Sequence, residues 1–293
     1  MPDDLSRIEE KMIRVFPRRT KWTPTDDLSF IGDPPLFRPP QRDVPVRISC
    51  TFTWDIQESL RLQRSWERFY SDVQVGGPAF DDPGAEFVPG RFIKEGVTIT
   101  SRGCSKNCDW CLVPKREGWI RELPIKDGWD VADNNLLACS RKHIESVFEM
   151  LRRQPDPIKF SGGLDAEMLQ EWHVDLLKSI KLKFAWFGCD YPGAIVNLQK
   201  AAELLVDFPV DKKHCYVLIG FNGEQIKTAE KRILQVYELG FLPYAMLYRG
   251  PDTLAKNMSH PLEWRELQRW GCMPWAYKRY GFDKFKRIRK NVN

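Results

Sequence analysis

Short apolar runs alternate with helical patterns from Val97 onward, and this alternation limits how the chain can fold more than any other feature. A repeated strand–helix pattern is typical of a parallel sheet built from β/α units. We expect an α/β fold in which helices follow most strands, with one helix at 165–180 capped by Asp165. The strands themselves are predicted, in chain order, at 97–100, 129–132, 158–161, 183–188, 215–219 and 243–248.

The first predicted strand leads directly into a loop with three cysteines in the spacing C-x3-C-x2-C. These are Cys104, Cys108 and Cys111, and the aromatic residue Trp110 precedes the third. Thiolates are the usual protein ligands of iron–sulfur clusters. A loop with three of them predicts a [4Fe–4S] cluster whose fourth iron is open for chemistry, so Cys104, Cys108 and Cys111 are the expected metal ligands.

Structural zinc is the competing interpretation of this loop. Zinc also binds closely spaced cysteines, but it needs a fourth ligand, which Cys139 or His143 would have to supply. On this alternative the chain is a zinc-stabilised nucleic-acid-binding module that uses its basic C-terminal tail. The other cysteines stand singly among mostly apolar residues, which indicates small buried side chains rather than ligands.

The composition is that of a chain with a large packed core. It has 293 residues, of which 42% are apolar and 12% aromatic. A net charge of +5, from 45 basic and 40 acidic residues, does not by itself demand a nucleic-acid partner. No apolar run reaches the ~18 residues of a membrane span, and Met1-Pro2-Asp3-Asp4 does not resemble a secretory signal. The sequence therefore favours a cytoplasmic location without membrane contact.

Shifts in composition divide the chain into four parts. We expect an irregular Pro-rich arm at 1–45, a small strand–helix–strand module at 46–95, the β/α units at 96–255 and a helical basic tail at 256–293. In the tail, aromatic residues interleave with basic ones. This pattern is typical of a solvated helix end, or else of a contact with RNA, DNA or another polyanion.

The cysteine spacing with Trp110 before the last cysteine resembles the signature of the radical S-adenosylmethionine (SAM) enzymes. This resemblance implies an incomplete (β/α)6, TIM-like barrel over 96–255, with SAM bound at the open iron. An external flavodoxin- or ferredoxin-like protein would supply one electron, and cleavage of SAM would give a 5′-deoxyadenosyl radical that abstracts hydrogen from a substrate. The resemblance does not identify the substrate, nor whether the enzyme is an oxidoreductase or a transferase.

Polar and glycine residues recur at the predicted carboxyl ends of the strands, where parallel α/β folds bind ligands. Ser161-Gly162-Gly163 resembles the Gly-Gly-Glu segment that holds the amine and carboxylate of SAM, although Leu164 stands at the glutamate position. Asp190 resembles the residue that binds the SAM ribose, and the strand around Ile219 and Gly220 resembles the segment that packs on adenine. The resemblance therefore implies a SAM site formed by Trp110, Ser161, Gly162, Gly163, Asp190, Ile219 and Gly220.

Four further residues on loops at the same end are candidates to face the substrate. Arg249 suits an anionic group, because a guanidinium pairs with such groups through two hydrogen bonds. A paired structural role is an equally consistent interpretation of each residue. The candidate catalytic residues are Glu117, Asn134, Asp165 and Arg249.

The module at 46–95 resembles the C-terminal half of the Rossmann-like domain that precedes the barrel in cobalamin-dependent radical SAM enzymes. The cobalt-binding histidine of that family has no counterpart, because no histidine precedes His143. Cys50 is the sole cysteine upstream of the motif, so the second cluster of methylthiotransferases cannot form there. We interpret the module as a truncated Rossmann-like remnant and do not expect it to bind cobalamin.

Overall fold

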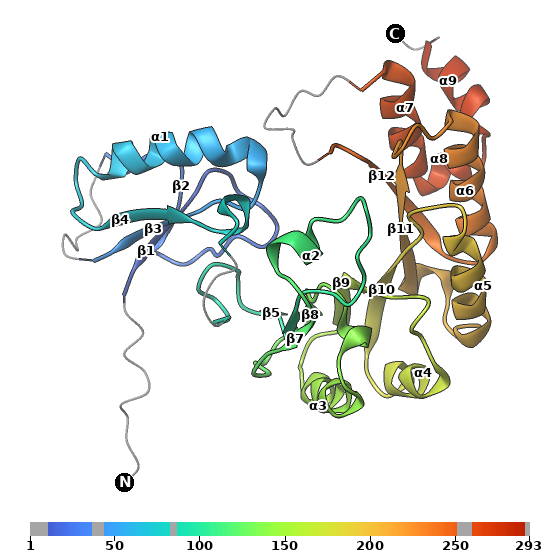
Figure 1. Cartoon of the computed structure of the whole chain (residues 1–293), viewed down its shortest axis with the longest axis horizontal. Helices are drawn as coiled ribbons and strands as arrows, with labels where there is room; N and C mark the ends of the chain where they lie inside the picture. The colour runs from blue at the N-terminus through green and yellow to red at the C-terminus, as the bar shows by residue number, and fades with distance from the viewer. Residues whose placement is uncertain (1–10, 37–43, 83–86, 251–259, 291–293) are drawn as a thin grey trace. The chain divides into compact units, whose positions relative to one another are not determined.

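The computed structural model describes residues 11–36, 44–82, 87–250 and 260–290. These residues form two compact units, an N-terminal unit up to Val97 and a C-terminal unit from Thr98 onward (Figure 1). The expected arm and module thus belong to one unit, and the β/α units and the tail belong to the other. No helix among the described residues has the length and apolar character needed to cross a bilayer.

The N-terminal unit is a four-stranded parallel sheet with helix α1 (Ile56–Trp66) packed on it. Leu62 and Trp66 of α1 are fully buried in a core that includes Ile13 and Ile48. The predicted strand–helix–strand module is therefore present. The strands follow the order β2 (Ser29–Ile31), β1 (Ile13–Phe16), β3 (Val46–Ser49) and β4 (Val73–Gly76).

The expectation of an irregular arm at 1–45 is wrong, because β1 and β2 lie in it and β1 is a central strand. Ile13 and Val15 are completely buried, and between them Arg14 is buried too. The Arg14 guanidinium donates hydrogen bonds to the backbone oxygens of Gly90 and Arg91, both at 2.8 Å, and also pairs with Asp26. A charged residue in a four-residue strand conceals the apolar pattern on which sequence prediction depends.

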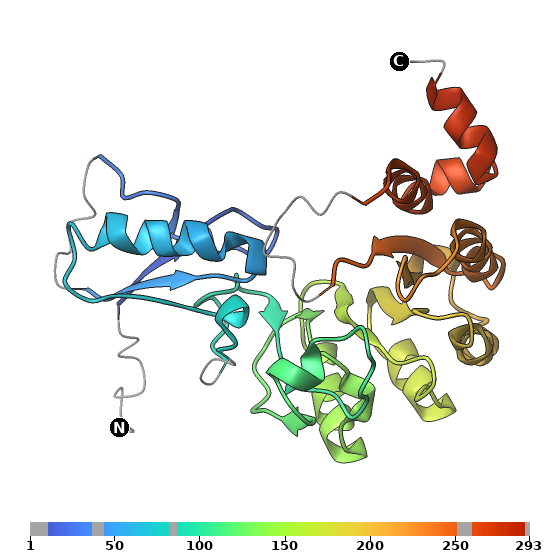
Figure 2. The same ribbon diagram turned by 45° about the horizontal axis from the view of Figure 1, so that its top comes forward.

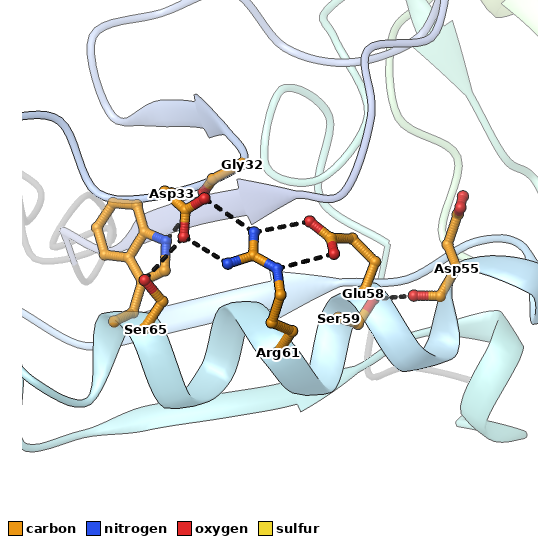
Figure 3. A network of polar contacts seen from close by, with 8 residues as sticks. Gly32, Asp33, Asp55, Glu58, Ser59, Arg61 and Ser65 are labelled. Atoms are coloured by element: carbon orange, nitrogen blue, oxygen red, sulfur yellow. Dashed lines mark hydrogen bonds and ion pairs between the residues drawn. The ribbon is translucent and has the colours of Figure 1, made fainter.

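A polar network ties the chain after β2 to the outer face of α1 (Figure 3). The Arg61 guanidinium donates to both carboxylate oxygens of Asp33 at 2.8 Å, and to Glu58 at 2.8 and 2.9 Å. Ser65 donates to Asp33 at 2.8 Å, and the Trp66 indole donates to the Gly32 oxygen at 3.1 Å. The hydrogen bonds from Arg61, and then from Ser65, lower the pKa of Asp33, and the network fixes the chain against the helix.

The C-terminal unit contains a six-stranded sheet whose strands lie in the order of the sequence. Strands β8 to β12 pair in parallel, and β5 lies beside β8. All six predicted strands are present, and the fold is α/β with parallel sheets. They are β5 (Val97–Thr98), β8 (Asp130–Val131), β9 (Ile158–Leu164), β10 (Leu182–Gly188), β11 (Lys213–Ile219) and β12 (Leu242–Leu247).

Helices cover one side of this sheet, as Figure 1 and the turned view in Figure 2 both show. A large apolar core lies between the sheet and these helices, with Phe148 and Phe187 among its fully buried residues. Short 3-10 turns, Leu136–Ala138 and Val210–Lys212, join some of the elements. The covering helices are α3 (Arg141–Arg152), α4 (Glu171–Lys178), α5 (Ala194–Leu204) and α6 (Ile226–Glu238).

Helix α4 begins later than predicted. The expected helix at 165–180 with an Asp165 cap is wrong, because β9 continues through the two glycines to Leu164 and Gln170 caps the helix instead. The Gln170 backbone amide donates to His173 Nδ1 at 3.0 Å, so the cap is reciprocal. Asp165 therefore lies on the loop between strand and helix.

The C-terminal tail folds into three helices, α7 (Leu262–Gly271), α8 (Pro274–Tyr277) and α9 (Phe282–Lys290). The aromatic residues among its basic ones are largely core residues: Tyr277, Phe282 and Phe285 are buried. Lys286 pairs with Glu263 at 2.8 Å. These buried rings anchor the tail to its own unit and are not available to stack on bases.

Candidate functional site

The cysteine loop, residues 103–118, is closed at its base because the chain entering it pairs with the chain leaving it. Strand β6 (Ser101–Arg102) pairs antiparallel with β7 (Arg121–Glu122), and the Cys104 amide donates to the Gly118 oxygen at 3.2 Å. Arg102 and Glu117 form an ion pair at 3.2 Å. A short helix, α2 (Val113–Arg116), fills the segment after Cys111. Glu117, a predicted substrate-facing residue, thus closes the loop.

Gly103 shows how tightly the base of the loop is packed. Its φ is +82°, and a Cβ at this position would lie 2.3 Å from the Trp119 oxygen. Only glycine combines this left-handed backbone with so close an approach.

The start of the cysteine loop is held by residues that follow β8. Asp133 is 1% exposed and accepts hydrogen bonds from the Thr100 amide and hydroxyl, both at 2.6 Å, and from the Ser101 hydroxyl at 2.7 Å. Burial raises the pKa of Asp133, although these hydrogen bonds oppose the change. Asn134 accepts from the Gly103 amide at 3.1 Å. The predicted residue Asn134 therefore helps to fix the loop.

Cys104, Cys108 and Cys111 are free thiols, each partly exposed. Burial, followed by the charge of neighbouring cysteines, raises the pKa of Cys108; burial also raises the pKa of Cys111. Within the described ranges, no three His, Cys, Asp or Glu side chains form a group that could hold a metal ion. The donor chemistry thus fits a thiolate-ligated cluster, while the three side chains do not form a closed metal site.

Lys106 connects the cysteine loop to the segment after β9. Its ammonium lies 2.7 Å from both Asp165 Oδ2 and Glu167 Oε2. Burial opposes its charge, but hydrogen bonds to these two carboxylates raise the pKa of Lys106 overall. Asp165 also accepts a hydrogen bond from Asn135 at 3.3 Å. The predicted residue Asp165 is thereby brought to the cysteine loop, as the partner of a lysine.

An aromatic cluster, Trp110, Tyr191, Phe221 and Tyr248, joins the cysteine loop to the ends of three strands. The Trp110 ring lies 5.7 Å from the rings of both Tyr191 and Phe221, and Phe221 lies 4.8 Å from Tyr248. Asp190 lies beside this cluster. Burial raises the pKa of Asp190, and hydrogen bonds with the Leu218 backbone and the Trp110 side chain oppose the shift. Trp110 and Asp190, both predicted to bind a cofactor, therefore lie together.

The Ser161-Gly162-Gly163 segment lies inside β9, next to the chain that follows β8. A Cβ on Gly162 would lie 2.0 Å from the Asp133 oxygen, so close packing requires glycine there. Gly163 has a φ of +103°, and the nearest atom to a Cβ there would be 3.8 Å away. Ser161 Oγ is buried and has no hydrogen-bond partner among the described residues. The segment thus has one glycine that close packing requires and one, in the left-handed region, beside which a Cβ would make only an ordinary contact with the Trp186 oxygen.

The residues at the end of β11 differ in what they can offer a ligand. The Ile219 side chain is fully buried in the helix-covered core, so the expectation that it packs on a cofactor does not hold for its side chain. Alternate side chains of a strand point to opposite faces of the sheet, so the Leu218 side chain lies on the face opposite to that of Ile219. Gly220, with φ +77°, donates its amide to Glu224 at 3.0 Å, and Glu224 pairs with the buried Arg232.

Arg249 directly follows Tyr248 of the aromatic cluster in the chain. It is exposed, two residues beyond the end of β12. Burial, and after it the charges of Arg249 and Arg265, lower the pKa of His260. Of the four substrate-facing candidates, Glu117, Asn134 and Asp165 are thus contacts of the loop.

Sequence reasoning placed Asn135 beside Asn134 at a strand end without giving it a role, and it did not single out Lys106, Asp133, Tyr191 or Phe221. The signal for three of these was present, since Asp133 directly precedes a predicted site residue, and each aromatic directly follows a predicted strand-end residue. Partly exposed thiols, hydrogen-bond donors, an aromatic cluster and a buried carboxylate thus lie side by side at the cysteine loop. No known family model matches the chain, and no curated protein matches its sequence.

Proposed function

We propose that the protein is a radical SAM enzyme whose cysteine loop binds a [4Fe–4S] cluster. One observation carries the proposal: Trp110 of the cysteine loop contacts Tyr191 and Phe221, which follow β10 and β11. The loop that would hold a cluster and the strand ends that would hold SAM therefore meet at one place. The sequential order of the sheet supports an incomplete (β/α)6 barrel, since strands of such barrels follow one another in this way.

The residues of the chain would divide the work as follows. Cys104, Cys108 and Cys111 would ligate the cluster, and Asp190 would accept hydrogen bonds from ribose hydroxyls. The aromatic cluster would cover the nucleoside and exclude water, and Gly163 would let the backbone approach the methionine end. When bound, the cluster would deliver the electron that cleaves SAM reductively, and the carbon radical so formed would start hydrogen abstraction from the substrate. A flavodoxin- or ferredoxin-like protein remains the proposed electron source.

The test is anaerobic reconstitution of the full chain with iron and sulfide. We expect about four irons per chain, a brown protein, and formation of 5′-deoxyadenosine from SAM when a strong one-electron reductant is added. Alanine at Cys104, Cys108 or Cys111 should abolish SAM cleavage. Cys272→Ala is the matched control, because Cys272 is also a partly exposed thiol but donates to the Ala245 oxygen at 3.3 Å, on β12.

A different metal would contradict the proposal. One zinc per chain, lost in Cys139→Ala or His143→Ala, together with no cleavage of SAM, would instead favour the zinc-stabilised module. His143 is buried, with its Nδ1 3.8 Å from Glu122 Oε2. Cys139→Ala should leave the iron content of a cluster-binding protein unchanged, so this variant separates the two interpretations.

A further inference from the structure

We infer that Asn135 is a positioning residue for the iron–sulfur cluster: its side-chain amide holds the Cys104 sulfur and, with the Lys106 backbone amide, raises the reduction potential of the cluster. The inference rests on the proposed function, since it requires Cys104 to be a cluster ligand. It assigns a role to a residue that the cysteine spacing does not include.

Two N–H groups converge on one sulfur. Asn135 Nδ2 lies 3.6 Å from Cys104 Sγ, and the Lys106 backbone nitrogen lies 3.4 Å from the same atom. Both distances are those of hydrogen bonds to sulfur. Asn135 is 5% exposed, so its bond to Cys104 has little competition from water.

The orientation of the Asn135 amide is fixed by its surroundings. Besides Cys104 Sγ, its Nδ2 faces Asp165 Oδ2 at 3.3 Å and Met168 Sδ at 3.9 Å, so all three neighbours are acceptors. The other end of the amide, Oδ1, is buried and has no hydrogen-bond partner within the described residues. A buried carbonyl without a partner is unfavourable. The fold thus keeps the Asn135 NH2 group on these acceptors and leaves the Asn135 carbonyl oxygen without a hydrogen bond among the described residues.

Asp165 makes this arrangement rigid. It lies on the loop after β9, where Lys106 of the cysteine loop pairs with it at 2.7 Å and offsets its charge. The amide of Glu167 donates to Asp165 at 3.1 Å. The carboxylate is therefore held by Lys106 and by the Glu167 backbone amide, and it in turn orients Asn135 toward Cys104.

Hydrogen bonds to the sulfurs of an iron–sulfur cluster are one means by which a protein sets its reduction potential. Reduction adds negative charge that is shared by the cysteine sulfurs, so an N–H dipole directed at a sulfur stabilises the reduced form more than the oxidised form. Removal of the Asn135 donor should make the cluster harder to reduce.

The experiment measures the midpoint potential of the reconstituted full chain by redox titration, followed by electron paramagnetic resonance of the reduced cluster. Asn135→Leu has no donor, and Asn135→Asp has the same size but presents an acceptor. We expect the reduction equilibrium to become less favourable by at least about threefold in Asn135→Leu, or about 30 mV at 59 mV per tenfold for one electron. The shift in Asn135→Asp should be larger.

Met168→Leu is the matched control, because it removes another neighbour of the same NH2 group and leaves the bond to Cys104. Its potential should equal that of the wild type. If Asn135→Leu takes up no cluster, Asn135→Asp provides the measurement. Loss of the cluster from both variants, with an unchanged far-ultraviolet circular dichroism spectrum, would also support a positioning role, since all three cysteines remain.

The failure of this inference can be distinguished from failure of the proposed function. A wild-type chain that binds no iron–sulfur cluster would overturn both. A wild-type chain that binds the cluster and cleaves SAM, together with variants of unchanged potential and unchanged resonance spectrum, would overturn the role of Asn135 alone.

Discussion

His173 shows how a single buried side chain can make stability depend on pH. It is 4% exposed, lines a cavity of about 440 Å³ with Cys139 and Met168, and its ring centroid lies 3.7 Å from that of Trp172. Its Nδ1 accepts from the Gln170 amide at the start of α4. Burial, and then the charge of Arg141, lower the pKa of His173 to about 4. The imidazole is therefore neutral in the folded protein.

Stability should fall as the pH decreases from about 6.5 to 4. In this window the unfolded chain binds a proton at His173 and the folded chain does not, so the contribution of this residue is complete above pH 6.5. At pH 5 the loss should be about 2 kcal/mol relative to pH 8. His173→Gln should remove this part of the pH dependence and keep a side-chain acceptor for the helix cap. Urea unfolding of both proteins at pH 8 and pH 5 tests this, and an equal fall in both would contradict it.

Helix α9 shows at the scale of an element how charge can obscure packing. Its sequence is dominated by lysine and arginine, yet Phe282 and Phe285 are buried in the core of the C-terminal unit. The Phe282 amide donates to Glu230 on α6 at 3.0 Å. The helix is therefore a packed element that also exposes basic residues, Lys284 and Arg287.

Phe285→Ala should destabilise the protein by about 3 kcal/mol, because it leaves a cavity in a packed core. Ile288→Ala, on the same helix but at a 40% exposed position, should cost less than about 1 kcal/mol. Chemical unfolding and amide exchange of α9 measure both effects. Equal stability of the two variants would indicate that the helix does not depend on this packing.

The elements that could be predicted from the sequence are those whose pattern is local. Strands β10 and β11 stand out because long apolar runs are bounded by polar residues, and α3 because its apolar residues recur at helical spacing. The structure departs from prediction where a distant contact decides, as for β1, whose Arg14 donates to the backbone oxygens of Gly90 and Arg91. The same holds for the site: the cysteine spacing is local, whereas Asn135 meets Cys104 only because β8 and the cysteine loop are brought together.

At the scale of the whole molecule, the described residues form two separate apolar cores. One surrounds Trp66 in the N-terminal unit, and the other includes Phe148 in the C-terminal unit. Each core is enclosed by its own sheet and helices, so a cavity in one should first loosen the elements around it.

Trp66→Ala should cost about 3–5 kcal/mol and speed amide exchange in β1, β3 and α1 more than in β10 and β11. Phe148→Ala is the reciprocal variant and should affect β9 and α3 first, since Phe148 packs on Phe160 of β9 with ring centroids 5.6 Å apart. Hydrogen exchange followed by mass spectrometry resolves the two patterns. Exchange that rises uniformly in both variants would show one cooperative unit instead of two.

The order of the strands also bears on how the protein forms as it is synthesised. From β9 to β12 each new strand pairs with the one made just before it, so its partner has already left the ribosome when it emerges. In the N-terminal unit β1 must wait for β3, which lies about 30 residues later, before it has neighbours on both sides. The C-terminal sheet can therefore assemble one strand at a time during translation. The cysteine loop is synthesised before β9, so it stays exposed until the later strands, whose ends contact it, have been made.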